Sequence, residues 1–366
     1  MKWSDILTII SGKNQKGVAS EDGEYFIYGS GGIIGRANDY LCPANTVIVG
    51  RKGTINHPLY VTEPFWNIDT AFGVVAGEEL LPKFLYYFCL QFNFKELDKS
   101  TGRPSVSKAD LLKIEMPIPN IEEQARIVSR IEELFSELDK GVETLQVIKE
   151  QLAVYRQAVL KMVFASMNER KSIQEVSSLV TSGSRGWAKY YNEKGVRFIR
   201  ITDLTRDKIK LKNNAIQRVL LPEGVEGKRS RLQGNDVLIS ITADLGSIAL
   251  VPEDVEEAYI NQHIAVVRFV NSHQGEFMAW YLKSDYGQKE LLRNKRGGGK
   301  LGLGLDDIRN TLVPIVSDEV ADEVVSEIES RMSVCDSIEQ IVGTALSQTE
   351  AMRQSILKKA FEGGLN

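Results

Sequence analysis

Basic segments that also carry glycine and hydroxyl residues recur at three places along this chain. They are Arg51–Thr54, Lys99–Ser105 and Arg293–Lys300. Lysine and arginine neutralise phosphates, glycine lets backbone amides approach a ligand, and serine or threonine hydroxyls add hydrogen bonds. Arginine, asparagine and glutamine can also recognise the edges of guanine and adenine. These residue types predict contact with nucleic acid, and a solvated basic loop is the alternative for any one segment taken alone.

A fourth segment, Ser184–Lys189, adds basic residues around Trp187, whose ring is equally compatible with a core position. The candidate DNA-binding residues are Arg51, Lys52, Thr54, Lys99, Thr101, Arg103, Ser105, Arg185, Lys189, Arg293, Lys295, Arg296 and Lys300. Segments 99–105 and 293–300 hold nearly matching places in the two halves of the chain, and this pairing favours DNA contact. We therefore expect Arg103→Ala and Arg296→Ala each to weaken DNA binding.

Patterns typical of an independent enzyme are missing from the sequence. Gly29–Gly35 fails the dinucleotide-binding spacing by one residue and lacks a Walker lysine, so a glycine turn is the favoured interpretation. His57, His263 and His273 have no carboxylates or cysteines arranged around them as in a catalytic triad or metal site. We therefore expect no catalytic residues, no metal and no cofactor on this chain.

Composition indicates an ordinary globular protein. The 366 residues allow two or more domains, and 43% of them are hydrophobic and 26% charged. The sequence contains no apolar run of about 18 residues, so it predicts no membrane span. Its first residues do not resemble a signal peptide. Cys42, Cys89 and Cys335 fit no metal-ligand spacing. We expect a cytoplasmic protein in which these thiols are reduced packing residues.

Charge is distributed unevenly, although the net charge is only −4. Residues 185–309 contain 21 lysines and arginines against 16 aspartates and glutamates, whereas residues 318–362 contain 4 against 10. A protein that is acidic overall can still present a basic groove. The second half of the chain therefore combines a basic globular part with an acidic helical segment.

An internal repeat organises the whole chain. Ile127–Glu132 returns as Val324–Glu329, and Arg156–Lys161 returns as Arg353–Lys358, both at an offset of 197 residues. Shorter matches precede them: Thr46–Val49 with Asp236–Ile239 as buried strands, and Phe84–Phe88 with Phe277–Tyr281 as aromatic helices. Extra residues rich in lysine, arginine and asparagine lie in the second copy between positions 205 and 232. The pattern predicts one scaffold used twice, with different surface loops.

Two long helices are predicted near residues 121–165 and 318–362 by apolar residues that repeat every 3.5 positions. The expected coiled-coil core is Ile127, Ile131, Leu134, Leu138, Leu145, Ile148, Leu152, Tyr155, Val324, Ile328, Ile338, Val342, Met352 and Ile356. Neither helix can bury its stripe alone, so we expect them to pair antiparallel within the chain. The alternative is that each helix recruits another protein separately.

The run Pro117–Val128 resembles the segment that opens the conserved region of type I restriction–modification specificity subunits. Tyr28–Gly35 is similar to a motif common in their target-recognition domains, and the order globule, helix, globule, helix matches the family across essentially the whole chain. The second copy departs from the first motif, because Val313–Val316 lacks the second proline.

This resemblance implies an α+β fold with a pseudo-twofold internal repeat: two mixed α/β target-recognition globules and two long helices in an antiparallel intramolecular coiled coil. The implied segments are target-recognition domains at 1–120 and 169–317 and helical spacers at 121–168 and 318–366. Each domain would read one half of a split, asymmetric DNA sequence, and the helices would set the distance between the halves.

The resemblance also implies partners. Two modification (methyltransferase) subunits would dock on the helices and use S-adenosylmethionine, restriction (translocase and nuclease) subunits would use ATP, and this chain would bind double-stranded DNA without catalysis. The alternatives are a coiled-coil scaffold without DNA binding and a catalytic DNA-modifying enzyme with an unrecognised site.

Overall fold

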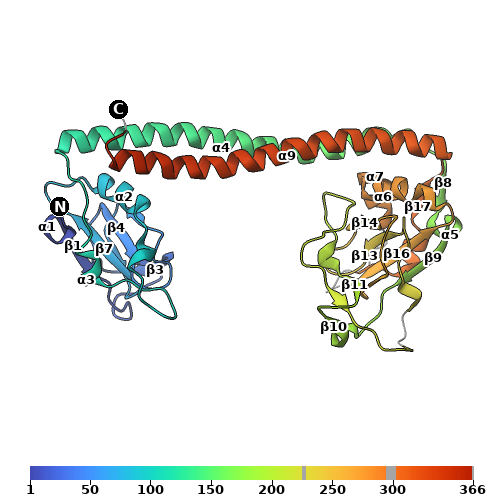
Figure 1. The fold of residues 1–366 in the computed structure, drawn as a ribbon, viewed down its shortest axis with the longest axis horizontal. Coiled ribbons are helices and arrows are strands. Elements are labelled where there is room, and N and C mark those ends of the chain that lie inside the picture. The colour runs from blue at the N-terminus through green and yellow to red at the C-terminus, as the bar shows by residue number, and fades with distance from the viewer. Residues whose placement is uncertain (225–227, 294–301, 365–366) are drawn as a thin grey trace. The chain divides into compact units, whose positions relative to one another are not determined.

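The computed structural model describes residues 1–224, 228–293 and 302–364, which form two compact units (Figure 1). Unit 1 comprises Met1–Gln146 with Gly343–Asn366, and unit 2 comprises Val147–Val342. Two helices of 44 residues each, α4 (Ile121–Phe164) and α9 (Asp318–Phe361), contribute to both units. Each unit therefore joins one globular part to a stretch of each long helix.

The globular part of unit 1 contains a four-stranded antiparallel sheet of order β1-β7-β4-β5 and a three-stranded sheet of order β3-β2-β6. The strands are β1 (Leu7–Ser11), β2 (Tyr25–Gly29), β3 (Gly32–Ala37), β4 (Thr46–Gly50), β5 (Leu59–Val61), β6 (Phe65–Asn67) and β7 (Ala71–Ala76). The short helices are α1 (Trp3–Ile6), α2 (Pro82–Gln91), the 3-10 helix η1 (Phe94–Leu97) and α3 (Lys108–Leu111).

The globular part of unit 2 contains sheets of order β14-β13-β16-β9, β10-β12-β11-β15 and β17-β8. The strands are β8 (Arg170–Ser172), β9 (Ser177–Ser182), β10 (Tyr191–Asn192), β11 (Val196–Ile199), β12 (Arg218–Val219), β13 (Val237–Ser240), β14 (Ile248–Leu250), β15 (Ala258–Ile260), β16 (Ile264–Phe269) and β17 (Leu312–Pro314). The helices are α5 (Ile173–Val176), α6 (Gly275–Lys283), α7 (Asp285–Leu291) and α8 (Leu305–Arg309), with 3-10 turns η2 (Trp187–Tyr190), η3 (Ile201–Asp203), η4 (Lys228–Ser230) and η5 (Ser272–Gln274).

The two globular parts share one topology. The order β1-β7-β4-β5 in unit 1 corresponds to β9-β16-β13-β14 in unit 2. A parallel strand pair also recurs at the same point of the two copies, β2 with β6 and β11 with β15. Asn45 and Asn235, both with positive φ (58° and 65°), precede the matching strands β4 and β13. The internal repeat seen in the sequence is therefore a repeat of tertiary structure.

Each long helix ends on the globular part of a different unit. The ring of Phe361, at the end of α9, lies 4.9 Å from Phe84 of α2 within unit 1. The ring of Phe164, at the end of α4, lies 5.6 Å from Phe277 and 5.4 Å from Tyr281, both on α6 within unit 2. Phe164 and Phe361 are related by the 197-residue offset, so the repeat extends to the way each helix is anchored.

The long helices run antiparallel within each unit. In unit 1 the Arg353 guanidinium pairs with Asp139, and Ile131 of α4 shares a buried cluster with Ala360 of α9. In unit 2 the Arg156 guanidinium lies 2.6 Å from Asp336 and 3.1 Å from Glu339, and Phe164 further along α4 shares a buried cluster with Ala321 near the start of α9. Moving forward along α4 corresponds in both units to moving backward along α9, which defines an antiparallel pair.

The predicted core of the helix pair was wrong at three positions. Tyr155, Ile338 and Met352 are exposed, at 44%, 37% and 52%. Beside Tyr155 and Met352 the following residue is the more buried one: the Arg156 side chain is 11% exposed and the Arg353 side chain 23%. An α-helix has 3.6 rather than 3.5 residues per turn, so residues spaced every 3.5 positions drift around a straight helix by about 20° per heptad. After several heptads the next residue along the chain occupies the buried face.

The other expected core residues are at least half-buried. Ile131, Ile328 and Val342 are buried. The half-buried residues are Ile127, Leu134, Leu138, Leu145, Ile148, Leu152, Val324 and Ile356.

The start of α4 shows why its sequence forms a helix there. The Asn120 side chain accepts a hydrogen bond from the Glu123 amide at 2.8 Å, which caps the first turn. Gln124 is fully buried, and its amide oxygen accepts from the Leu81 amide at 2.8 Å at the start of α2. Gln124 also donates to the Glu79 and Pro119 carbonyls, both at 2.8 Å. The motif therefore attaches α4 to the globular part.

Two general properties of the described ranges bear on function. No helix among them combines enough length and apolar character to cross a membrane. Within the same ranges no three His, Cys, Asp or Glu side chains gather as a metal site. The three cysteines are buried and unpaired, and burial raises the pKa of the Cys42 thiol to about 12.

Candidate nucleic-acid interface

Two of the basic segments predicted from the sequence meet in unit 1. Lys52 forms an isolated antiparallel bridge with Ser105, and the Gly53 amide donates to the Pro104 carbonyl at 2.8 Å. The Gly53 backbone has φ +83°, and a Cβ added there would lie 2.8 Å from Nη2 of Arg103. The structure thus places the segments 51–54 and 99–105 side by side, with the exposed Arg103 side chain against Gly53.

A carboxylate orders the second of these loops. Asp98 accepts hydrogen bonds from the Ser100 hydroxyl at 2.7 Å, the Ser100 amide at 2.9 Å and the Ser105 amide at 3.1 Å. These bonds, led by that from the Ser100 hydroxyl, lower the pKa of Asp98. Lys99 pairs with Asp110 at 3.2 Å and stays largely exposed. The loop is therefore ordered from within while its cationic side chains face solvent.

The glycine-rich turn between β2 and β3 also lies at this place. The Ser30 hydroxyl donates to the Lys52 carbonyl at 2.8 Å, and Gly32 adopts φ +118°. Ile33 and Ile34, which follow it, are exposed at 56% and 52%. Sequence reasoning interpreted this segment as a glycine turn, and the hairpin confirms that interpretation. It did not foresee that the turn adjoins the basic loop at Lys52.

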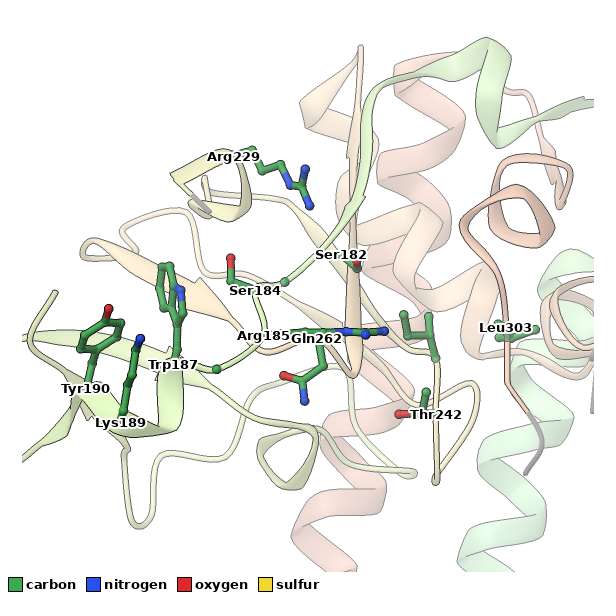
Figure 2. Close-up of a pocket in the computed structure, with 13 residues that line it drawn as sticks. Ser182, Ser184, Arg185, Trp187, Lys189, Tyr190, Arg229, Thr242, Gln262 and Leu303 are labelled. Carbon is green, nitrogen blue, oxygen red and sulfur yellow. The ribbon is translucent and has the colours of Figure 1, made fainter. Parts of the chain in front are cut away.

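In unit 2 the predicted DNA-binding residues of segment 184–189 border an open cavity of about 1110 Å³ (Figure 2). Arg185 and Lys189 line it and are exposed. No described residue forms an ion pair or hydrogen bond with the Arg185 side chain, which extends in this view toward the side where Thr242 lies. The other lining residues are Ser182, Gly183, Ser184, Gly186, Trp187, Tyr190, Arg229, Ile241, Thr242, Gln262 and Leu303.

Trp187 belongs mainly to the core, which decides between the two interpretations of its sequence. It is 4% exposed, its ring stacks on Phe198 with centroids 5.7 Å apart, and it meets the edge of Tyr259 at 5.1 Å. A buried ring of this kind cannot offer its face to a base. Its role is to support the segment that presents Arg185 and Lys189.

The other basic segment predicted in unit 2, residues 293–300, is only partly described. Arg293 is exposed and its guanidinium lies 4.0 Å from Glu290, whereas Lys295, Arg296 and Lys300 lie outside the described residues. Directly after them, Gly302 bridges Thr242 at the rim of the cavity.

The attachment of this segment repeats that of unit 1. The Leu303 amide donates to the Ile241 carbonyl at 3.0 Å, as the Val106 amide donates to the Arg51 carbonyl at 2.9 Å. Leu303 and Val106 are separated by the same 197 residues as the helix matches. In both units, therefore, the loop after the central strand β4 or β13 is joined to the end of a basic, glycine-containing segment.

Three lining residues of the cavity were missed by sequence reasoning. Thr242 and Gln262 are isolated polar residues after strands, and no sequence signal distinguishes them. Arg229 lies in the extra stretch of the second copy, and the abundance of lysine, arginine and asparagine there was the available signal. Together with Arg185 and Lys189 they form a polar and cationic wall suited to an anionic, hydrogen-bonding ligand.

Comparison with known proteins gives this arrangement a family. A family model described as the type I restriction modification DNA specificity domain matches residues 1–150 and 170–340, one match for each repeat. The chain is 24% identical over 352 residues to the type I restriction enzyme EcoBI specificity subunit of Escherichia coli, covering 87% of this chain and 73% of that protein.

Solved structures share the fold. One chain comes from a study of complex assembly and conformational transition of the type I R-M system; its TM-score is 0.76 at 17% identity, covering 100% of this chain and 97% of that one. The HsdS subunit from Thermoanaerobacter tengcongensis gives 0.55, also at 17% identity, covering 100% and 96%. With the family model spanning both repeats, the chain belongs to the DNA specificity subunits of type I restriction–modification systems.

Proposed function

We propose that each globular part of this chain reads one half of a split, asymmetric DNA sequence. The observation that carries the proposal is that, in both units, the residues directly after a basic, glycine-containing segment bond to the loop that follows the central strand. A duplicated scaffold with different side chains at its rim suits two half-sites of different sequence. In this assignment residues 1–120 and 169–317 are the target-recognition domains.

The chemistry of the two rims supports contact with double-stranded DNA. Exposed lysine and arginine side chains at Lys52, Lys99 and Arg103 in unit 1 neutralise phosphates and release counterions. Arg185 in unit 2 can form two hydrogen bonds with a guanine edge, and Gln262 can do so with adenine. Contacts of the first kind position the protein, and contacts of the second kind select the sequence.

We further propose that the long helices, residues 121–168 and 318–366, act as the spacer that fixes the distance between the two half-sites. One turn of B-DNA is about 34 Å, so two half-sites have to be read at a set helical phase. A helix pair joined by ion pairs such as Arg156 to Asp336 suits that demand better than a flexible linker.

The helix surface supports docking of modification subunits. Within unit 2, Val154 of α4 and Ile341 of α9 are 71% and 66% exposed, and Val334 is 58% exposed. Apolar side chains in water favour association with a partner. We propose that two methyltransferase subunits bind here, that restriction subunits join them, and that S-adenosylmethionine and ATP bind to those partners in the cytoplasm. Adenine has to leave the base stack to be methylated, and binding energy from this chain supports that step.

The test is a map of adenine methylation in the host genome with and without the gene for this chain. The expected result is the loss of methylation at one motif made of two unlike halves separated by a spacer of constant length. An unchanged map would contradict the proposal. Methyl transfer by the purified chain alone would instead favour a catalytic enzyme.

A further inference from the structure

Three side chains at the cavity of unit 2 form a continuous hydrogen-bonded chain. Oγ1 of Thr242 lies 2.6 Å from Nδ1 of His263, and Nε2 of Gln262 lies 2.9 Å from Nε2 of the same ring. Thr242 and Gln262 line the cavity, while His263 joins them without lining it. All three are half-buried, so each outer group keeps a side that faces solvent.

The backbone holds the histidine in place. Its carbonyl accepts from the Ile241 amide at 2.9 Å, and its amide donates to the Asn261 side chain at 3.1 Å. Thr242 follows Ile241 directly and bridges Gly302. These bonds fix the histidine backbone beside Ile241 and Asn261, and the hydrogen bonds to Thr242 and Gln262 orient the imidazole between those two side chains.

The chain of bonds couples the polarity of its two ends. A neutral imidazole has one nitrogen that donates and one that accepts. When the Gln262 amide donates to Nε2, Nδ1 donates to Thr242, and the threonine proton is free to point into the cavity. In the opposite tautomer the rotated Gln262 oxygen accepts from Nε2, and the Thr242 hydroxyl donates to Nδ1. The cavity then receives an amide donor from Gln262 and lone pairs from Thr242.

Unit 1 lacks this device. The Arg51 amide donates to the Thr70 carbonyl as the Ile241 amide donates to the His263 carbonyl, so Lys52, Asp69 and Thr70 stand at the places of Thr242, Gln262 and His263. Neither an imidazole nor a linked hydroxyl and amide stands at these positions. Any effect of the histidine should therefore be confined to the half-site read by unit 2.

We propose that His263 is a positioning residue that links the hydrogen-bond polarity of Thr242 and Gln262, so that these two side chains select the base edges of one half-site as a coupled donor and acceptor. The inference rests on the proposed function and names the device that sets selectivity within it. Without the imidazole, the Thr242 and Gln262 side chains can each rotate and present either a donor or an acceptor to a base, so discrimination between bases falls.

The test uses this chain in complex with its modification subunits and measures methylation of DNA duplexes. The wild-type motif is determined first, and each position of both half-sites is then substituted in turn. His263→Leu removes both bonds, His263→Asn keeps a partner for Thr242, and His263→Gln keeps a partner for Gln262. His273→Leu is the control, because His273 is an exposed histidine of the same unit that pairs with Asp322.

The expected result for His263→Leu is a fall of about 5-fold or more in discrimination at one or more positions of a single half-site, the size of a mismatch effect. The other half-site should keep wild-type discrimination. His263→Asn and His263→Gln should lower discrimination between bases at fewer positions than His263→Leu. Wild-type discrimination in all three variants would overturn the proposal. If the Leu variant is inactive, the other two decide: relaxed selectivity supports the proposal and unchanged selectivity overturns it. A wild-type complex that methylates no split motif would instead overturn the proposed function.

Discussion

Arg103 is the residue of unit 1 whose surroundings best suit contact with DNA. Its exposed guanidinium lies against the Gly53 backbone, where a side chain would collide with it. Asp98 orders the loop through Ser100 and Ser105, so Arg103 is presented from a defined backbone. An ordered loop loses less conformational entropy on binding than a flexible one.

We expect Arg103→Ala to weaken binding of the assembled complex to its DNA site by about 1 to 3 kcal/mol, measured by titration at several salt concentrations. If Arg103 contacts a phosphate, the slope of log K against log salt should also fall by about one. Lys113→Ala is the matched control, because it removes one positive charge from an exposed lysine of the same unit that already pairs with Asp110. Equal affinities and slopes for the two variants would contradict the assignment.

Among the elements, the contact between α6 and α9 in unit 2 contains a carboxyl group that is costly to ionise. Burial, together with the neighbouring Glu329 carboxylate, raises the pKa of Glu276 from its usual 4.5 to about 7. The folded state therefore favours the neutral carboxyl. This contribution to stability is complete below pH 4.5 and is lost as the pH rises through about 7.

We expect Glu276→Gln to raise the melting temperature of unit 2 relative to wild type by an amount that grows between pH 4.5 and 7 and is constant above. The gain in unfolding free energy at pH 8 should be about 1 to 2 kcal/mol, less than the full shift would give, because Glu276 is partly exposed. A series of thermal melts of the variant and the wild type across this pH range measures the trend. A pH-independent difference would contradict the shifted pKa.

The register of the long helices allows a test of the spacer. The ion pairs Asp139–Arg353 and Arg156–Asp336 are separated by equal stretches of chain on both helices. If seven residues are inserted between these positions in α4 alone, the two ion pairs can no longer form at the same time. We expect that insertion to disrupt assembly or change the tolerated spacer, whereas matched insertions in both helices should restore assembly with a new spacer length.

Methylation of duplexes with systematically varied spacers measures this outcome. A single insertion that leaves full activity and the original spacer preference would contradict the proposal that the helices act as a spacer. The matched double insertion controls for damage to the helix itself, because it carries the same added residues.

On the scale of the whole molecule, one scaffold occurs twice, and under the proposed function each copy reads a different half-site. Arg103 belongs to unit 1 and Arg185 to unit 2. Independent contacts with separate parts of a ligand contribute additively to its binding free energy. The repeat therefore predicts that substitutions in the two units have additive effects on the DNA-binding free energy.

We expect the losses in DNA-binding free energy from Arg103→Ala and Arg185→Ala to add within about 0.5 kcal/mol in the double variant. Each single variant should lower discrimination in a different half-site, measured with duplexes substituted in one half at a time. Losses confined to the same half-site for both variants would show that the two units do not read separate halves.

The sequence by itself determined the repeat, the two long helices and the segments that carry the candidate interface. These features depend on local patterns: the constant offset of 197 residues, the apolar period, and capping residues such as Asn120. The basic segments 51–54 and 99–105 were also recognisable, because lysine, arginine and glycine in one loop are informative without neighbours.

Only the tertiary structure decided which residues lie together. The inward turn of Arg156 in place of Tyr155 depends on the true helical period and on carboxylates that α9 places opposite. The meeting of Ser30 with Lys52, and of Thr242 with His263, joins residues 22 and 21 positions apart in sequence. Such contacts follow from strand order and packing, which bring together residues that no local period relates.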